Sequence, residues 1–126
     1  MSVFDASNIK CYEEDEVLTV AISDDAVDPQ GFVIITRLDE EDSASIDACI
    51  GLQTAAAEYE MADAIQKVSL SRNKLEIEIK KAYWKHFKSE TVVANFKKQA
   101  LDEKKINLLK ESLRKILEGS SVVVDF

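Results

Sequence analysis

An alternation of apolar and polar residues with a period of two recurs through the first eighty residues of this 126-residue chain. Residues 17–23, VLTVAIS, show it clearly. Leu18, Val20 and Ile22 fall on one face of this segment, because successive side chains of a β-strand point to opposite faces of the sheet. Residues 65–80 hold two alternating runs separated by SRNK, which predicts a β-hairpin.

Weaker strand patterns occur elsewhere in the chain. They cover residues 8–12, 31–36, 46–53, 91–96 and 120–126. Gly51 lies inside one of these runs and suggests a β-bulge or a close approach of another backbone. Residues 53–64 carry alanines that favour a helix, but their place between strands favours a sheet, so the sequence leaves their structure open.

The strongest helical pattern is LDEKKINLLKESLRKILEG, residues 101–119. Its apolar stripe consists of Ile106, Leu109, Leu113, Ile116 and Leu117. Asp102 is the expected N-cap, Leu101 and Ile106 are placed to form a hydrophobic staple, and Gly119 is expected to end the helix. Residues 82–89, AYWKHFKS, predict one or two further helical turns.

These patterns predict a single α+β domain over residues 1–126, with an antiparallel sheet of about six to eight strands and one C-terminal amphipathic helix packed on it. A chain of this length can bury a core without disulfides, and Cys11 and Cys49 are expected to be free thiols. The sequence shows neither a membrane span nor a signal peptide at its N-terminus, so a cytoplasmic location is expected.

Charge is distributed unevenly along the chain. Residues 1–66 hold 16 acidic residues and two basic ones, Lys10 and Arg37, for a net charge of −14. Residues 67–126 hold 14 basic and eight acidic residues, which leaves the whole chain at −8 with an isoelectric point near 4.7. Such a balance argues against nucleic acid as a partner and favours a basic protein.

Of the 16 acidic residues in residues 1–66, 11 fall in three clusters. They are Glu13 to Glu16, the trio Asp24, Asp25 and Asp28, and the run Asp39, Glu40, Glu41 and Asp42. Neither of the last two fits a calcium-binding loop, because the turn glycine and the bidentate glutamate are both missing. The trio has enough carboxylates to hold magnesium weakly, but such residues are more often polar turn residues, and no metal site is predicted.

Catalytic chemistry finds little support in the sequence. His86 is the one histidine, and neither a cysteine nor a serine motif prepares it to act as a base. A phosphate-binding loop and a nucleophile elbow are both absent from the sequence. We therefore expect a non-enzymatic protein without a cofactor.

Binding is the remaining function class. A single acidic cluster is ordinarily a solubility feature, but three within thirty residues, with one compensating base, indicate a field directed at a partner. A basic, phosphate-binding protein surface is the natural target of such a field. The predicted contacts are Asp24, Asp25, Asp28, Asp39, Glu40, Glu41 and Asp42, with Trp84 as a second contact. The strand order decides whether Glu13 to Glu16 share a rim with the run from Asp39 to Asp42, and the sequence leaves it open.

Three segments in this order resemble the tenth immunity-protein family of bacterial polymorphic toxin systems. They are residues 12–37 (YEEDEVLTVAISDDAVDPQGFVIITR), 65–81 (IQKVSLSRNKLEIEIKK) and 105–117 (KINLLKESLRKIL). The resemblance implies a small cytoplasmic antitoxin, of the kind paired with contact-dependent growth inhibition toxins. Such a protein would bind a cognate toxin, here a basic nuclease-type domain, and would be a monomer when free.

Two other protein classes stay open. A secretion chaperone is also small, acidic and α+β, but such chaperones typically open with a helix and need an apolar dimer face. A metal-dependent enzyme would require a bound metal after purification.

Overall fold

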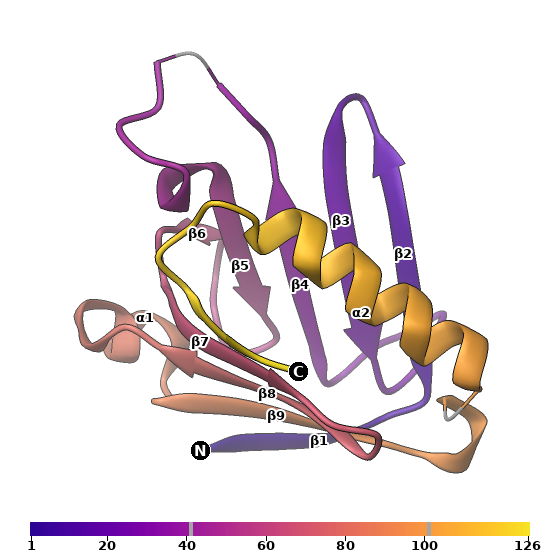
Figure 1. The fold of residues 1–126 in the computed structure, drawn as a ribbon. Coiled ribbons are helices and arrows are strands. Elements are labelled where there is room, and N and C mark those ends of the chain that lie inside the picture. The colour runs from indigo at the N-terminus through magenta and orange to yellow at the C-terminus, as the bar shows by residue number, and fades with distance from the viewer. Residues whose placement is uncertain (41, 101) are drawn as a thin grey trace.

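A computed structural model describes residues 1–40, 42–100 and 102–126. These residues contain ten β-strands in two five-stranded sheets, with two α-helices and three short 3₁₀ turns (Figure 1). The predicted α+β class, with a C-terminal helix packed on strands, is confirmed. The ten strands form two sheets, however, whereas the sequence predicted one sheet of about six to eight strands.

The first sheet, which we call the meander sheet, follows the order of the chain. Its strands are β2 (Asn8–Glu14), β3 (Val17–Ser23), β4 (Phe32–Arg37), β5 (Ile50–Thr54) and β6 (Met61–Ala62). Every neighbouring pair in it is antiparallel. Each strand pairs with the next one along the chain, and the longest connection, residues 38–49, contains the 3₁₀ turn Asp47–Cys49.

The second sheet, which we call the mixed sheet, has the order β1-β9-β8-β7-β10. Its strands are β1 (Ser2–Ala6), β9 (Thr91–Phe96), β8 (Lys74–Ile79), β7 (Ile65–Leu70) and β10 (Val123–Asp125). The β7–β8 hairpin is antiparallel, as predicted, whereas β1 and β10 pair with their neighbours in parallel. Strand β10 confirms the predicted edge strand. The sequence pattern did not predict β1, because this strand is short and only Ser7 separates it from β2.

Helix α2 (Glu103–Leu117) lies across β2, β3 and β4 of the meander sheet (Figure 1). The Asp102 carboxylate caps it by accepting a hydrogen bond of 2.8 Å from the backbone N–H of Lys104. Its buried residues are Leu109, Leu113, Ile116 and Leu117, which confirms most of the predicted stripe. Leu101 of the predicted staple lies outside the described residues. One continuous core joins this stripe to side chains of both sheets.

The region from Ile46 to Ala64 departs from the predicted pattern. Residues Asp47–Cys49 form a 3₁₀ turn, and the strand begins only at Ile50. Gly51 does mark a close approach, but the group that approaches it is the Glu60 side chain rather than a backbone. The segment that the sequence left open, residues 53–64, contains the end of β5, then turns and the two-residue strand β6.

Candidate functional site: an acidic end of the meander sheet

Two of the three acidic clusters leave the meander sheet at the same end. Strand β3 lies between β2 and β4, with Glu14 opposite Val17 and Leu18 opposite Arg37. The β2–β3 turn and the segment that follows β4 therefore extend beyond the sheet in the same direction (Figure 1). We call this region the acidic end. Its described carboxylates are Glu13, Glu14, Asp15, Glu16, Asp39, Glu40 and Asp42. Glu41, which the sequence also predicted as a contact, lies outside the described residues.

The trio Asp24, Asp25 and Asp28 lies at the opposite end of the same strands, in the β3–β4 loop. At about 3.3 Å per residue, the length of β4 puts roughly 20 Å between the two ends. Asp24 accepts hydrogen bonds from the backbone N–H groups of Gln30 (3.0 Å) and Gly31 (2.9 Å), and Asp25 accepts one from Val27 (3.0 Å). Asp24 and Asp25 thus hold the loop. The structure does not bring the trio together with the run that starts at Asp39.

Trp84 is also separate from the acidic end. It belongs to α1 (Trp84–Phe87), which lies beside the mixed sheet, away from the β2–β3 hairpin (Figure 1). Its indole N–H donates a hydrogen bond of 2.7 Å to the backbone carbonyl of Ile79, and the ring packs against the core. These contacts give Trp84 a structural role in joining α1 to β8. The predicted contact residues therefore do not form one surface.

Arg37 is the basic residue nearest to the acidic run in the sequence, and its guanidinium forms hydrogen bonds within the fold. Its Nη1 group donates to the backbone carbonyls of Lys115 (3.2 Å), Ile116 (3.1 Å) and Glu118 (2.6 Å). These oxygens belong to the last turn of α2, where helix carbonyls lack partners within the helix and carry partial negative charge. Only 12% of the Arg37 side chain is exposed. This guanidinium is therefore a helix cap.

Most charges of the acidic end have no ion-pair partner among the described residues. Arg37 Nε lies 2.8 Å from Asp39 Oδ1, and this is the one ion pair of the described chain that includes a carboxylate of the acidic end. The Asp39 side chain still remains 70% exposed. This end of the sheet therefore carries an excess of negative charge that ion pairs do not neutralise.

The tip of the β2–β3 hairpin has an unusual backbone. Asp15 and Glu16 adopt positive φ angles of 52° and 68°. Two such residues between paired strands match the type I′ turn, which usually contains Asn-Gly because other side chains are disfavoured at positive φ. Aspartate is also common at the first position of this turn, but glycine is usual at the second, so Glu16 is a carboxylate that turn stability does not favour. Glu13 to Glu16 were not among the predicted contacts, although their position between two strand-like segments was a usable signal.

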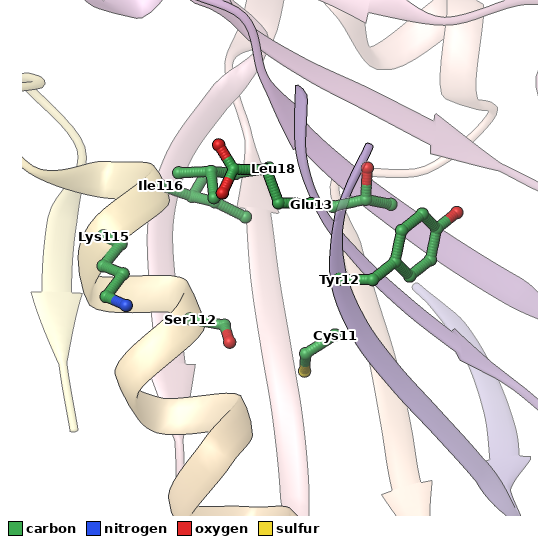
Figure 2. A pocket seen from close by; sticks show the side chains of 8 residues that line it. Cys11, Tyr12, Glu13, Leu18, Ser112, Lys115 and Ile116 are labelled. Atoms are coloured by element: carbon green, nitrogen blue, oxygen red, sulfur yellow. The ribbon is translucent and has the colours of Figure 1, made fainter. Parts of the chain in front are cut away.

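A small cavity of about 160 Å³ lies between α2 and β2, beside the acidic end. Figure 2 shows Cys11 and Ser112 facing each other across it, whereas Tyr12 points to the opposite side of β2. Burial raises the pKa of the Cys11 thiol, and the hydrogen bond with Ser112 offsets only part of that rise. The thiol is thus protonated at neutral pH, and this cavity does not activate it as a nucleophile.

A second group of charges fastens the C-terminal segment. Asp47 accepts hydrogen bonds from the backbone N–H (2.8 Å) and the hydroxyl of Ser121, and Lys80 Nζ lies 3.4 Å from it. Lys80 also lies 2.5 Å from Asp63. Burial by itself raises the pKa of the Asp47 carboxyl, but the Ser121 and Lys80 hydrogen bonds favour its charged form and leave the pKa below the ordinary value. The Asp63 hydrogen bond raises the pKa of Lys80.

Protonation of Asp47 is expected to weaken the fold in acid. The pKa of the Asp47 carboxyl is lower in the folded than in the unfolded chain. The stability that the ionised carboxylate adds to the fold is therefore complete above the unfolded pKa of about 3.9, and it is lost as the pH falls through the folded pKa. We expect Asp47→Asn to lose less stability between pH 6 and pH 3 than the wild type. Urea unfolding at both pH values measures this difference, and equal losses in the two proteins would contradict the assignment.

Within residues 1–40, 42–100 and 102–126, no three His, Cys, Asp or Glu side chains are arranged to bind a metal ion together. In those ranges, no helix has the length and apolar composition needed to cross a membrane.

Comparisons with known proteins give no assignment. No protein-family model matches the sequence, and no curated protein matches it at a significant level. The resemblance to the tenth immunity-protein family therefore stays a prediction.

Proposed function

We propose that this protein is an antitoxin that binds a basic, nuclease-type toxin domain through its acidic end and thereby neutralises it. The observation that carries the proposal is the convergence of the β2–β3 turn and the segment after β4 at one end of the meander sheet. The pairing register brings together carboxylates from two clusters that are more than twenty residues apart in the sequence. The resemblance to the tenth immunity-protein family supports the same function.

The chemistry of the proposed partner follows from the charge of this surface. A nuclease binds phosphates with lysine and arginine side chains, and an array of carboxylates can occupy the same side chains in place of nucleic acid. Complementary charges at the rim of an interface mainly raise the association rate. The proposed contacts are therefore the carboxylates of the acidic end. They exclude the trio Asp24, Asp25 and Asp28 and the indole of Trp84, which lie outside this surface.

Co-expression with a basic nuclease-type toxin domain tests the function, and the gene directly upstream of this chain is the first place to seek its cognate toxin. We expect the chain to restore growth to cells that produce the toxin domain and to suppress its activity on nucleic acid in vitro. We also expect the affinity to fall as salt is raised towards 1 M, where the Debye length is about 3 Å. Size-exclusion chromatography with light scattering should show a monomer when the chain is free.

Two results would contradict the antitoxin proposal. One is a complex that forms without any loss of toxin activity. The other is a dimer that promotes export of the partner, which would instead identify a secretion chaperone. The wild-type chain with an unrelated nuclease domain is the specificity control.

A further inference from the structure

A groove crosses the outer face of the meander sheet at the acidic end. Its volume is about 360 Å³. Val17 and Thr36 line it and alternate along their strands with core-facing residues, so the groove lies on the face opposite α2. Leu38 and Ala62 add further apolar wall, and Glu40 contributes a carboxylate from the segment after β4. The groove is therefore continuous with the acidic end.

A second carboxylate, Glu60, is held in position inside the groove. The Thr36 hydroxyl donates a hydrogen bond of 2.5 Å to Glu60 Oε1. Gly51 lies beneath this pair, and a Cβ atom there would collide with the Glu60 carboxylate and lie 2.8 Å from Thr36 Oγ1. The glycine thus leaves the space in which Glu60 reaches Thr36. Glu60 could not be predicted from local sequence, because its contact joins the segment before β6 to Thr36 of β4.

The groove has a defined chemical character. None of the ion pairs in the described parts of the chain includes Glu40 or Glu60. Two carboxylates repel phosphates and other anions, and the volume is near the lower end of ligand-sized cavities, which span roughly 300–1,000 Å³. A long side chain with an apolar stem and a cationic head matches these features, because lysine and arginine bury their methylene groups while the head pairs with carboxylates.

We propose that this groove receives an arginine or lysine side chain of the partner protein and forms the central anchor of the interface. The proposal rests on the proposed function and deepens it. Interfaces commonly obtain most of their binding energy from a few side chains in pockets, surrounded by a polar rim that excludes water. Here the acidic end is the rim, which steers the encounter, and the groove retains the partner once it is bound.

A titration of the ¹⁵N-labelled protein with the peptide acetyl-Gly-Arg-Gly-amide tests the groove itself. We expect saturable chemical-shift changes at the backbone amides of Thr36, Gly51 and Ala62. The matched peptide, in which neutral citrulline replaces arginine, should leave those amides unchanged, because it has the same shape without the charge. Absence of saturable changes at these amides, or equal changes with both peptides, would overturn the proposal.

Two variants and a matched control sharpen the test. Glu60→Gln removes the charge and keeps the shape, and Gly51→Ala displaces the carboxylate by the added methyl group. We expect both to bind the arginine peptide about tenfold more weakly. Glu58→Gln removes a nearby exposed charge outside the groove and should bind like the wild type. Thermal unfolding of each variant verifies that it is folded.

Binding of the cognate toxin domain separates this inference from the proposed function. If Glu60→Gln binds the toxin domain as tightly and dissociates as slowly as the wild type, the anchor is wrong, although the antitoxin function stands. If the wild type neither binds nor neutralises the toxin domain, the proposed function fails, whatever the peptide titration shows. Faster dissociation of Glu60→Gln with an unchanged association rate is the expected result.

Discussion

Replacing Leu109 by alanine is expected to lower the free energy of unfolding by about 2–5 kcal/mol. This leucine is 0% exposed and belongs to the stripe by which α2 packs on the meander sheet. Removing the side chain leaves a cavity among core residues that cannot fully close around it. Urea unfolding followed by circular dichroism measures the loss.

The neighbouring Leu108 provides the control, because it is 49% exposed on the same helix. Leu108→Ala changes the same side chain and should cost well under half as much. Leu109→Asp should prevent folding, since it places an unpaired charge in the core. A Leu109→Asp protein that folds normally but no longer binds its partner would show that the stripe is an interface instead.

Reversing charges at the acidic end is expected to weaken toxin binding by about two to three orders of magnitude, mainly through slower association. The variant is the triple substitution Glu14→Lys, Glu16→Lys and Asp42→Lys. It spares Asp39, whose carboxylate pairs with the helix cap Arg37, and Glu40, which lines the groove. The change therefore alters the rim without disturbing either of those contacts. Binding kinetics at low and high salt measure the effect.

A second triple substitution supplies the matched control: Asp5→Lys, Glu76→Lys and Glu78→Lys. These residues lie on the outer face of the mixed sheet, and either triple changes the net charge from −8 to −2. A small effect of the control beside a large effect at the acidic end would locate the binding surface. Equal losses in the two variants would show a response to net charge alone, and no loss in either would remove the acidic end from the interface.

Local periodicity was sufficient to predict much of the fold. Residues 17–23, the hairpin in 65–80 and the helix beginning after Asp102 each have a repeat that is complete within one segment, so each was predictable. Strand β1 was not, because its stability comes from pairing with β9, far along the chain. The division into two sheets depends on similar distant pairings, which an alternating pattern does not specify.

The candidate site depended still more on distant contacts. Composition indicated a directed acidic field, but it could not show that Asp24 and Asp39 lie at opposite ends of β4. It also could not show that the Arg37 guanidinium donates a hydrogen bond to the carbonyl of Ile116, or that the Trp84 indole donates one to the carbonyl of Ile79. The sequence therefore predicted an acidic binding surface without locating it, whereas the pairing register was needed to say which carboxylates lie at one end of the sheet.

The parallel pairing of β1 with β9 sets the order in which the two sheets can be completed during synthesis. Every strand of the meander sheet has been made once residue 62 leaves the ribosome. By contrast, β1 precedes every strand of the meander sheet, yet its strand partner spans Thr91–Phe96, and β10 follows only at Val123–Asp125. Closing a loop of some ninety residues costs more chain entropy than joining consecutive strands. Strand β1 therefore has no access to its native strand partner until the chain has been translated through Phe96.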